Sequence, residues 1–145
     1  MGEEHQQLLL DNQLCFLVYS TNLAINQVYR QLLAPLKLTY PQYLVMLVLW
    51  EKDQVTVSEI GDRLFLESST LTPILKKLES AQLIHRKRSK KDERMVIISL
   101  TEQGIDLQLQ AIDIPHQITQ AASCSPKTLF ELKNQLAELR HNLTK

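Results

Sequence analysis

Cysteine, glycine and proline are scarce in this chain, whose 145 residues include only 2 cysteines, 3 glycines and 5 prolines. The two cysteines, Cys15 and Cys124, lie far apart and form neither a disulfide framework nor a zinc site. The chain has no glycine-rich phosphate loop, carboxylate pair or Ser-His-Asp set that would indicate an enzyme. His116 and His141 lack partners at metal-ligand spacing, so we expect no metal and no cofactor.

Net charge and long apolar runs are also absent. The 16 lysines and arginines balance 16 aspartates and glutamates, which argues against a protein that coats nucleic acid but allows a local basic DNA reader. The longest apolar run, Leu44–Trp50, is far shorter than the ~20 residues of a membrane-spanning helix. The polar, acidic N-terminus does not resemble a signal peptide. We therefore expect a cytoplasmic protein with one domain and a real core.

The middle of the chain has the pattern of two helices separated by a short turn. The first predicted helix, Val57–Phe65, begins with Thr56 and Glu59 at the spacing of a capping box. The second covers about Ser69–Ala81 and should begin within the four residues before Pro73, because proline is tolerated only near a helix start. The predicted buried face of the second helix consists of Leu71, Ile74, Leu75 and Leu78.

Two strand-like segments follow the second helix. Leu83–Arg88 and Met95–Leu100, the latter rich in β-branched residues, predict a hairpin around a polar loop over residues 89–94. A helix–turn–helix followed by a β-hairpin is the winged-helix arrangement. From His85 to Arg94 the hairpin carries six cations and two anions, which gives +4 within ten residues of a neutral chain.

DNA contact is expected from the exposed face of the second helix and from the hairpin. A charge run is often only a solvated loop, but its position directly after a helix–turn–helix favours DNA contact. Lys90 and Lys91 should meet phosphates, and Arg94 is the minor-groove candidate. Asp92 should support Arg94, because DNA phosphates repel a carboxylate. The expected DNA-contacting residues are Ser68, Ser69, Thr70, Thr72, Lys76, Lys77, Arg86, Lys90, Lys91 and Arg94.

Apolar residues at helical spacing dominate the N-terminal part of the chain. One long helix is predicted from Leu8 to about Leu33, ended by Pro35. Tyr40 and Pro41 should open a second helix, whose segment Gln42–Trp50 is apolar nearly all round and hence buried. The first helix has more apolar surface than a small domain can cover, so we expect a partner chain.

The C-terminal part is also helical. A helix is predicted over Glu102 to about Ala122, with a kink or break at Pro115. Ser125 should cap the last helix, which begins at Pro126 and runs to about Leu143 with leucines at three- and four-residue steps. Helical ends that pack between two chains would form a homodimer.

The whole pattern predicts one mainly α domain with a small β-hairpin wing, a winged helix–turn–helix that dimerises through its terminal helices. Residues 1–38 and 102–145 are assigned to dimerisation and residues 39–101 to DNA binding. This order of elements resembles the MarR family of bacterial repressors. Asp92-x-Arg94 at the wing tip and Leu100-Thr101-Glu102-Gln103-Gly104 after the second wing strand are typical of that family.

Three further segments resemble the organic-hydroperoxide-sensing OhrR branch of the family. These segments are Asp11–Phe16 around the first cysteine, Thr39–Leu44, and Arg86–Ser89. The resemblance covers essentially the whole chain. It implies an inverted-repeat operator in double-stranded DNA, a second copy of the chain and an organic hydroperoxide as partners, and no membrane.

The resemblance also implies roles for individual residues. Cys15 is then the peroxide sensor, Tyr29 and Tyr40 hydrogen-bond to it, and Tyr19 belongs to the same neighbourhood. Cys124, placed before the last helix, implies the two-cysteine subgroup. In that subgroup oxidation joins Cys15 of one subunit to Cys124 of the other, and the repressor releases its operator.

A peroxide-sensing cysteine needs neighbours that stabilise its thiolate, and the sequence offers tyrosines for Cys15. Thiolates react with peroxides, and tyrosine hydroxyls can stabilise a thiolate by donating hydrogen bonds. Cys15 and Tyr19 are four residues apart on one helix face. Tyr29 lies ~21 Å from Cys15 along a straight helix, at ~1.5 Å per residue. Tyr29 can therefore contact only the Cys15 of a partner, in an antiparallel arrangement of the first helices.

Simpler interpretations stay open at this stage. Cys15 can be a small core residue, Tyr19 and Tyr29 can be interface packing, and Cys124 can be an incidental free thiol. One other function is a MarR-type repressor released by a small phenolic or lipophilic ligand, with Cys15 lining the pocket. Another is a thiol peroxidase or redox carrier whose winged helix is incidental. The leading hypothesis is a thiol-switched repressor that is not an enzyme.

Overall fold

A computed structural model describes residues 2–145; Met1, the first residue of the predicted 1–38 segment, lies outside the described residues. The chain divides into two compact units, Met1–Ile112 and Asp113–Lys145. The elements are α1 (Glu3–Gln6), η1 (Leu10–Asn12), α2 (Leu14–Leu33), η2 (Ala34–Leu36), α3 (Tyr40–Glu51), β1 (Val55–Thr56), α4 (Val57–Leu64), α5 (Ser68–Ser80), β2 (Ile84–Arg88), β3 (Val96–Leu100), α6 (Glu102–Ala111), α7 (Ile114–Ala122) and α8 (Pro126–Leu143). The predicted mainly α fold with a small wing is confirmed.

The core of the first unit is built around α3. Thr39 and Gln42 form a capping box at its start, and Pro41 occupies the first turn, where a missing N–H costs nothing. The helix is buried along most of its circumference, as its uniformly apolar sequence predicts. Its fully or nearly fully buried side chains are Tyr43, Val45, Met46, Val48 and Leu49.

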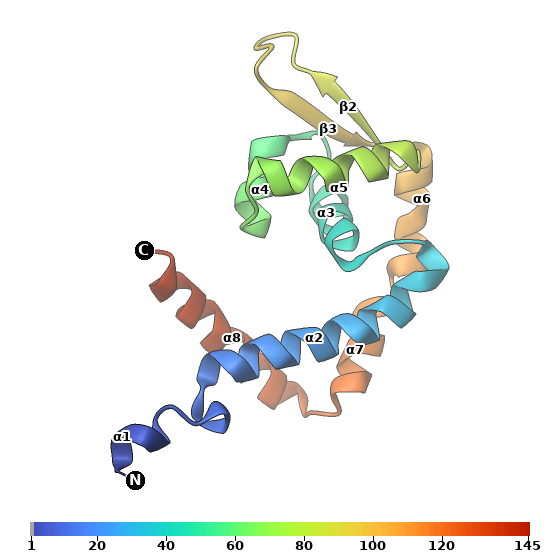
Figure 1. Cartoon of the computed structure of the whole chain (residues 1–145). Helices are drawn as coiled ribbons and strands as arrows, with labels where there is room; N and C mark the ends of the chain where they lie inside the picture. The colour runs from blue at the N-terminus through green and yellow to red at the C-terminus, as the bar shows by residue number, and fades with distance from the viewer. Residues whose placement is uncertain (1) are drawn as a thin grey trace. The chain divides into compact units, whose positions relative to one another are not determined.

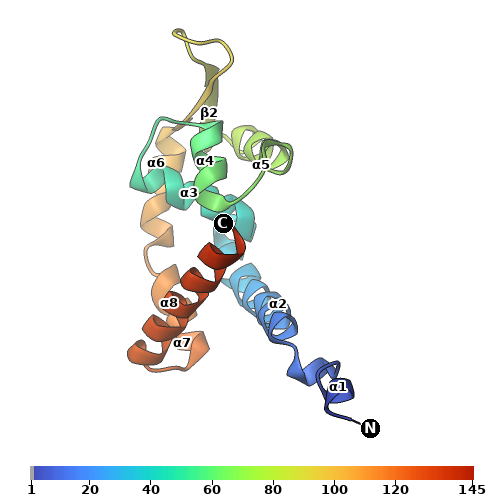
Figure 2. The ribbon, with the colours of Figure 1, turned by 90° about the vertical axis from the view of Figure 1, so that its left-hand side faces the viewer.

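The helix–turn–helix, α4 and α5, packs against α3 (Figures 1 and 2). The predicted capping box is present, with Thr56 and Glu59 each bonding the other's backbone N–H. Helix α5 begins at Ser68, one residue earlier than predicted, and Pro73 lies inside it. The hydroxyl of Thr72 donates to the carbonyl of Ser68 at 2.7 Å, in the turn that Pro73 leaves one hydrogen bond short.

The buried face of α5 is narrower than predicted. Leu71, Leu75 and Leu78 are fully buried, whereas Ile74 is only half-buried. Because successive residues rotate by ~100° around a helix, Ile74 lies at the margin of the stripe that the three leucines define.

The wing is part of a three-stranded antiparallel sheet in the order β1-β3-β2. The hairpin runs from Ile84 paired with Leu100 to Arg88 paired with Val96, and its tip extends beyond α4 and α5 (Figure 1). Strand β1, which is only two residues long and pairs Val55 with Ile98, was not predicted from the sequence. Two residues carry no periodicity, so only the pairing partner defines this strand.

Helix α6 packs against the sheet and α3 at a point of close backbone approach. Thr101 caps the helix by accepting from the N–H of Gly104 at 3.0 Å. The indole N–H of Trp50 donates to the carbonyl of Gly104 at 2.9 Å. A Cβ at position 104 would collide with the carbonyl of Leu83, so glycine is required there.

The predicted single helix from Leu8 to Leu33 is wrong at its start, because α2 begins only at Leu14. Gln13 is extended, and its side-chain amide donates to the carbonyls of Gln7 and Leu9. The amide of Asn12 likewise bonds the carbonyl of Gln6. Such polar side chains compete for backbone groups and interrupt the helix. The C-terminal limit is confirmed, since η2 with Pro35 follows Leu33.

The break predicted near Pro115 is present. Helix α6 ends at Ala111 and α7 begins at Ile114, with the proline in the first turn of α7. In the second unit Ser125 caps α8 by accepting from the N–H of Thr128 at 3.1 Å. The last helix therefore starts at the predicted residue, and it ends at Leu143 as predicted.

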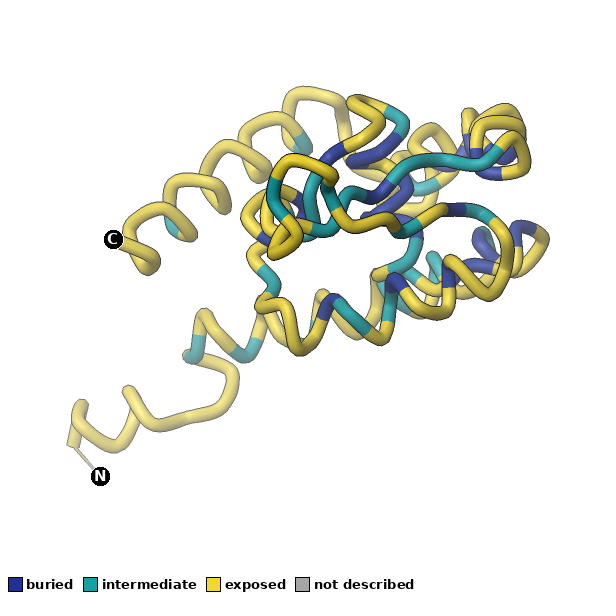
Figure 3. The backbone as a smooth tube through the Cα atoms, turned by 90° about the horizontal axis from the view of Figure 1, so that it is seen from above, coloured by how far each residue is buried: buried dark blue, intermediate teal, exposed yellow. Residues whose placement is uncertain are grey.

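Buried residues cluster in α3–α6 and the sheet, while most of α2 and α8 is exposed (Figure 3). In the part of the chain that the structure describes, no single helix has the length and apolar composition to cross a membrane. Leu14–Leu36 and Tyr40–Glu51 satisfy those criteria only together, as a pair bent by 66°.

Candidate DNA-binding surface and cysteine sites

The polar face of α5 is available for contact with a large ligand. Ser68, Ser69 and Thr70 in its first turn are exposed, and Thr72 is half-buried. Lys76 and Lys77 are exposed further along the helix. The fully buried leucines Leu71, Leu75 and Leu78 on the opposite face anchor the helix in the core, so this polar face points outward.

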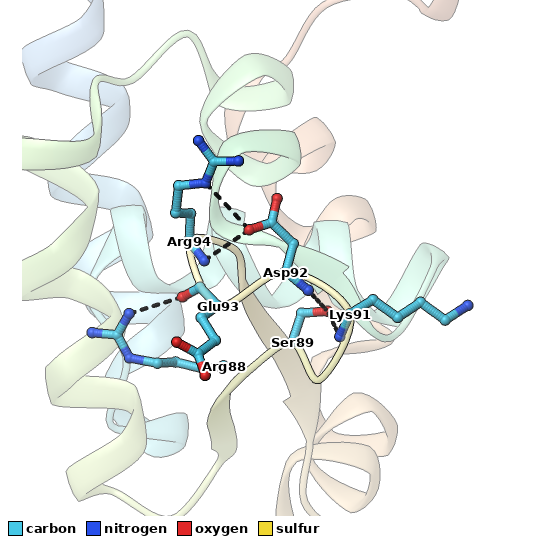
Figure 4. Close-up of polar contacts among 6 residues, drawn as sticks. All are labelled: Arg88, Ser89, Lys91, Asp92, Glu93 and Arg94. Carbon is cyan, nitrogen blue, oxygen red and sulfur yellow. Dashed lines mark hydrogen bonds and ion pairs between the residues drawn. The ribbon is translucent and has the colours of Figure 1, made fainter.

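The wing tip is ordered by hydrogen bonds among its own residues (Figure 4). The carboxylate of Asp92 accepts from the backbone N–H of Arg94 at 3.0 Å and lies 3.4 Å from its Nε. The Arg94 side chain is nevertheless 92% exposed. This geometry fits the predicted role of Asp92, because the carboxylate holds the base of Arg94 and leaves the guanidinium accessible.

Ser89 and Arg88 stabilise the wing loop through hydrogen bonds to its backbone. The hydroxyl of Ser89 accepts from the N–H groups of Lys91 and Asp92, at 3.2 and 3.4 Å. Arg88 donates to the carbonyl of Glu93 at 2.9 Å (Figure 4). The loop thus presents the exposed cations Lys90 and Lys91 on a fixed backbone.

Arg86 differs from the other predicted DNA-contacting cations. Its side chain is 27% exposed, and its Nε lies 3.3 Å from a carboxylate oxygen of Glu79 on α5. That distance defines an ion pair, but the N–H is not directed for a hydrogen bond and is left unpaired. Glu79 is not among the residues predicted from the sequence, because the pairing of a helix end with a strand has no local signature.

Cys15 lies in the first turn of α2 and is exposed, as is Tyr19 one turn later. The side chains around them on the same helix are apolar and also exposed, including Leu14, Leu17 and Val18. Cys15 is therefore not a core residue of the chain as described. It belongs to an apolar surface that the first unit leaves uncovered.

Tyr29 and Tyr40 form a ring cluster with Tyr43, which the sequence analysis did not name. The ring centroid of Tyr29 lies 4.5 Å from that of Tyr40 and 5.8 Å from that of Tyr43. Burial, helped by the neighbouring phenols, raises the pKa of Tyr29 to about 12, and burial also raises the pKa values of Tyr40 and Tyr43. These hydroxyls therefore stay protonated and can donate hydrogen bonds at neutral pH.

A cavity of about 350 Å³ opens beside Tyr40. Arg30 and Asn26, one turn apart on α2, line it together with Thr39. The side-chain oxygen of Asn26 is buried and has no hydrogen-bond partner among the described residues. The structure thus places the cation of Arg30 in the same cavity as Tyr40. The sequence around Cys15 alone could not reveal this neighbour.

Cys124 lies in the second unit, between α7 and α8, and is exposed. Its thiol donates to the carbonyl of Ala122 at 3.3 Å. Within residues 2–145, no group of three or more histidine, cysteine or acidic side chains is arranged to hold a metal ion.

Comparison with known proteins identifies the family. Residues 27–110 match the family described as transcriptional regulator SarA/Rot. The chain belongs to this family. It is also 46% identical to the organic hydroperoxide resistance transcriptional regulator of Bacillus subtilis over 143 residues, 99% of this chain and 97% of the relative. The HTH-type transcriptional regulator TtmR of Methylorubrum extorquens is 46% identical over 92% of this chain and 69% of the relative.

Solved structures of AbfR from Staphylococcus epidermidis resemble the chain in three chemical states. Reduced AbfR bound to DNA is 37% identical, with a TM-score of 0.77 over 97% of this chain and 99% of AbfR. Overoxidized AbfR bound to DNA is 36% identical, with a TM-score of 0.76 over 95% and 98%. Disulfide-formed AbfR is 40% identical, with a TM-score of 0.65 over 94% and 96%.

The resemblance inferred from the motifs is thereby confirmed, both for the MarR-type fold and for the organic hydroperoxide branch. The chain is thus a DNA-binding transcriptional regulator.

Proposed function

We propose that this regulator is a homodimeric repressor that releases its operator when an organic hydroperoxide oxidises Cys15. The observation that carries the proposal is the exposed thiol of Cys15 in the apolar first turns of α2, in a chain 46% identical to an organic hydroperoxide resistance regulator. A repressor released by a small ligand, with an unreactive Cys15, is not favoured by these relatives.

Dimerisation is supported by the apolar surface of the terminal helices. Six large side chains of α2, from Leu14 to Ile25, are 41% to 63% exposed, and Phe130, Leu132 and Leu136 of α8 are 43% to 62% exposed. An exposed apolar surface of this kind on a helix marks a site of protein–protein interaction. We assign residues 1–38 and 102–145 to the dimer interface and 39–101 to DNA binding. The two α5 helices would then read successive major grooves ~34 Å apart.

Activation of Cys15 would come from the partner chain. Helix α2 is continuous from Leu14 to Leu33, so Tyr29 lies ~21 Å along it from Cys15 of the same chain. In an antiparallel pair of α2 helices, Cys15 would face the Tyr29 and Tyr40 hydroxyls of the other protomer. Those neutral donors, with Arg30 as a nearby cation, would stabilise the thiolate, and Tyr19 would pack beside it.

The oxidation proceeds in two balanced steps. The Cys15 thiolate attacks the terminal peroxide oxygen and the O–O bond breaks, so that Cys15 becomes a sulfenic acid and the leaving alkoxide takes a proton from water to become the alcohol. The thiol of Cys124 from the other subunit then attacks the Cys15 sulfur, which releases water and forms a disulfide. A disulfide requires Cα atoms within ~7 Å, so closing the gap would move the interface helices and change the spacing of the α5 pair.

The disulfide, rather than added oxygen, is proposed to release DNA. AbfR has been solved both overoxidized on DNA and as a disulfide form, and the overoxidized state evidently still binds. By analogy, this chain with a sulfinic or sulfonic Cys15 would keep its operator, whereas the cross-linked dimer would lose it.

Operator binding of three proteins under organic hydroperoxide tests this scheme. The wild type should lose DNA and recover it with dithiothreitol, and non-reducing electrophoresis should show a covalent dimer. Cys15→Ser should stay bound. Cys124→Ser should react, accumulate sulfinic acid by mass spectrometry, and remain bound far longer than wild type. A monomer band with no Cys15–Cys124 link in oxidised wild type would refute the two-cysteine mechanism.

The wing assignment has its own test. Arg94→Ala should weaken operator binding through loss of a minor-groove contact, and Lys90→Ala should weaken it with less sequence selectivity. Unchanged binding by Arg94→Ala would contradict the role assigned to the wing tip.

A further inference from the structure

Asn22 lies in the middle of the exposed apolar surface of α2. Its side chain is exposed, and its amide makes no hydrogen bond within the part of the chain that the structure describes. Val18, Tyr19 and Ile25, each about one turn away from it, are 41% to 63% exposed. An asparagine in such surroundings is solvated in a single chain, but it becomes a buried polar group when a second chain covers α2.

Asn22 also shares a face of the helix with two residues of the proposed sensor. Cys15, Asn22 and Tyr29 follow one another at steps of seven residues. Seven residues at ~3.6 per turn make almost two full turns, so Asn22 points within ~20° of the direction of Cys15, and Tyr29 within ~40°. Because α2 is continuous from Leu14 to Leu33, the three side chains form one row along it.

A twofold axis determines where this row meets its copy. In the proposed dimer, on which this step rests, Cys15 of one protomer faces Tyr29 of the other. Twofold symmetry makes each contact occur in both directions, so Tyr29 of the first protomer also faces Cys15 of the second. The axis then passes midway between positions 15 and 29 of α2, which is position 22. The residue at this midpoint therefore lies opposite its own copy.

Asparagine is a residue type that can pair with its own copy. Its side-chain amide carries both donors and an acceptor, so two amides related by a twofold axis can exchange two hydrogen bonds. We propose that Asn22 pairs in this way with Asn22 of the partner subunit and sets the register of the two α2 helices. Apolar side chains tolerate a shift along the helix, whereas a shift leaves two buried amides without partners. Asn22 is thus a positioning residue, because this register places Cys15 opposite the tyrosines of the other protomer.

Cross-linking at position 22 tests the position of the axis. Asn22→Cys is made in a chain that carries Cys15→Ser and Cys124→Ser, so the introduced thiol can form a disulfide only with its own copy. A disulfide needs Cα atoms within ~7 Å, a distance that facing residues at a twofold axis can satisfy. Treatment with the thiol oxidant diamide should convert most of this protein into a covalent dimer on non-reducing electrophoresis.

Val18→Cys and Asn26→Cys in the same background are the matched controls. Both positions lie four residues from Asn22, on the same side of α2. In the proposed register each of them is level with the other in the partner, so two copies of either thiol are ~12 Å apart along the helix axis, at ~1.5 Å per residue. Neither control should form more than a trace of covalent dimer.

The reactivity of Cys15 tests the positioning role. Asn22→Leu, in a Cys124→Ser chain, should sediment as a folded dimer at least as stable as its parent, because it removes a buried polar pair. Its Cys15 should nevertheless react with cumene hydroperoxide about tenfold more slowly, since a shifted register loses a hydrogen bond to the thiolate. Asn22→Ser, whose hydroxyl also donates and accepts, should react at nearly the parent rate.

Two results would overturn the pairing. One is a protein that sediments as a dimer although Asn22→Cys cross-links no better than the controls, which would place the axis elsewhere. The other is an Asn22→Leu variant whose Cys15 reacts at the parent rate. Either result leaves peroxide sensing intact, because the wild type would still lose its operator on oxidation of Cys15. A wild type that sediments as a monomer would instead contradict the proposed dimer, and the pairing with it.

Discussion

The winged-helix region and the terminal helices place their apolar residues in opposite environments. In α3, α4 and α5 most of the large apolar side chains are buried within the chain itself, as for Met46, Ile60 and Leu71. Helix α2, although 20 residues long, buries only Leu33, and α8 buries none of its residues. The winged-helix region therefore has a complete core, whereas the terminal helices leave much of their apolar surface exposed.

The boundary between these two behaviours runs through α2. Its C-terminal end is held to α3 by the packing of Tyr29 on Tyr40 and Tyr43 and by the buried Leu33. Its N-terminal turns, with Cys15 and Tyr19, are exposed. A single helix thus joins the buried winged-helix core to the exposed surface that carries Cys15 and Tyr19. Under the proposed function, a change at that surface would be transmitted along α2 to the winged-helix region.

The largest expected effect comes from opening the complete core. Leu71→Ala removes a fully buried side chain and should lower the free energy of unfolding by about 3–5 kcal/mol through lost burial and a cavity. Denaturant unfolding measures this change. The decrease in unfolding free energy should be the same at low and high protein concentration. A decrease that depends on concentration would place Leu71 in an interface and contradict the assignment of a self-contained core to the winged-helix region.

A charge in the exposed apolar surface should act differently. Leu17→Glu replaces a side chain that is 55% exposed in the single chain. If α2 is an interface, an unpaired buried carboxylate should weaken the dimer by about 3 kcal/mol while the winged-helix region stays folded. Analytical ultracentrifugation should show monomers with a native circular dichroism spectrum. Exposed Gln31→Glu near the other end of the helix is the control and should remain dimeric.

A local capping effect is smaller. Thr56→Ala removes the hydroxyl that accepts from the N–H of Glu59 and should cost about 1 kcal/mol of stability. Thr56→Ser should restore most of it, since serine supplies the same oxygen. Thermal unfolding of the three proteins makes the comparison, and equal melting temperatures would show that the box contributes nothing to the module.

The smallest effect concerns the tyrosines at the boundary and is confined to alkaline pH. The raised pKa of Tyr29, about 12 against an ordinary 10.0, means that the folded state holds this proton more tightly than the unfolded state. Its contribution is present below pH 10 and is lost as the pH rises toward 12. Tyr29→Phe should therefore flatten the decline of the unfolding midpoint above pH 10 and leave the midpoint at pH 7 nearly unchanged.

Local signals in the sequence specified most of the elements. The capping box of Thr56 and Glu59, the prolines at the starts of α3 and α8, and the alternation in the wing each involve residues within a few positions of one another. Such interactions form in the same way wherever the segment lies, so they can be predicted without the fold. The Asp92–Arg94 contact belongs to this class, being made across two residues. Even local patterns failed where side chains competed for the backbone, as at Gln13, which interrupts the predicted first helix.

Only the tertiary structure decided the contacts between distant segments. The pairing of Val55 with Ile98, the bond from Trp50 to Gly104 and the ion pair of Glu79 with Arg86 depend on how helices and strands pack. The tyrosine cluster arises in the same way, from two helices that meet only after folding. Composition and spacing record which groups are available, whereas burial and packing determine which of them meet and which are left without partners. In this protein, local patterns in the sequence predicted the winged-helix elements, whereas tertiary packing determined which side chains meet at the candidate sites.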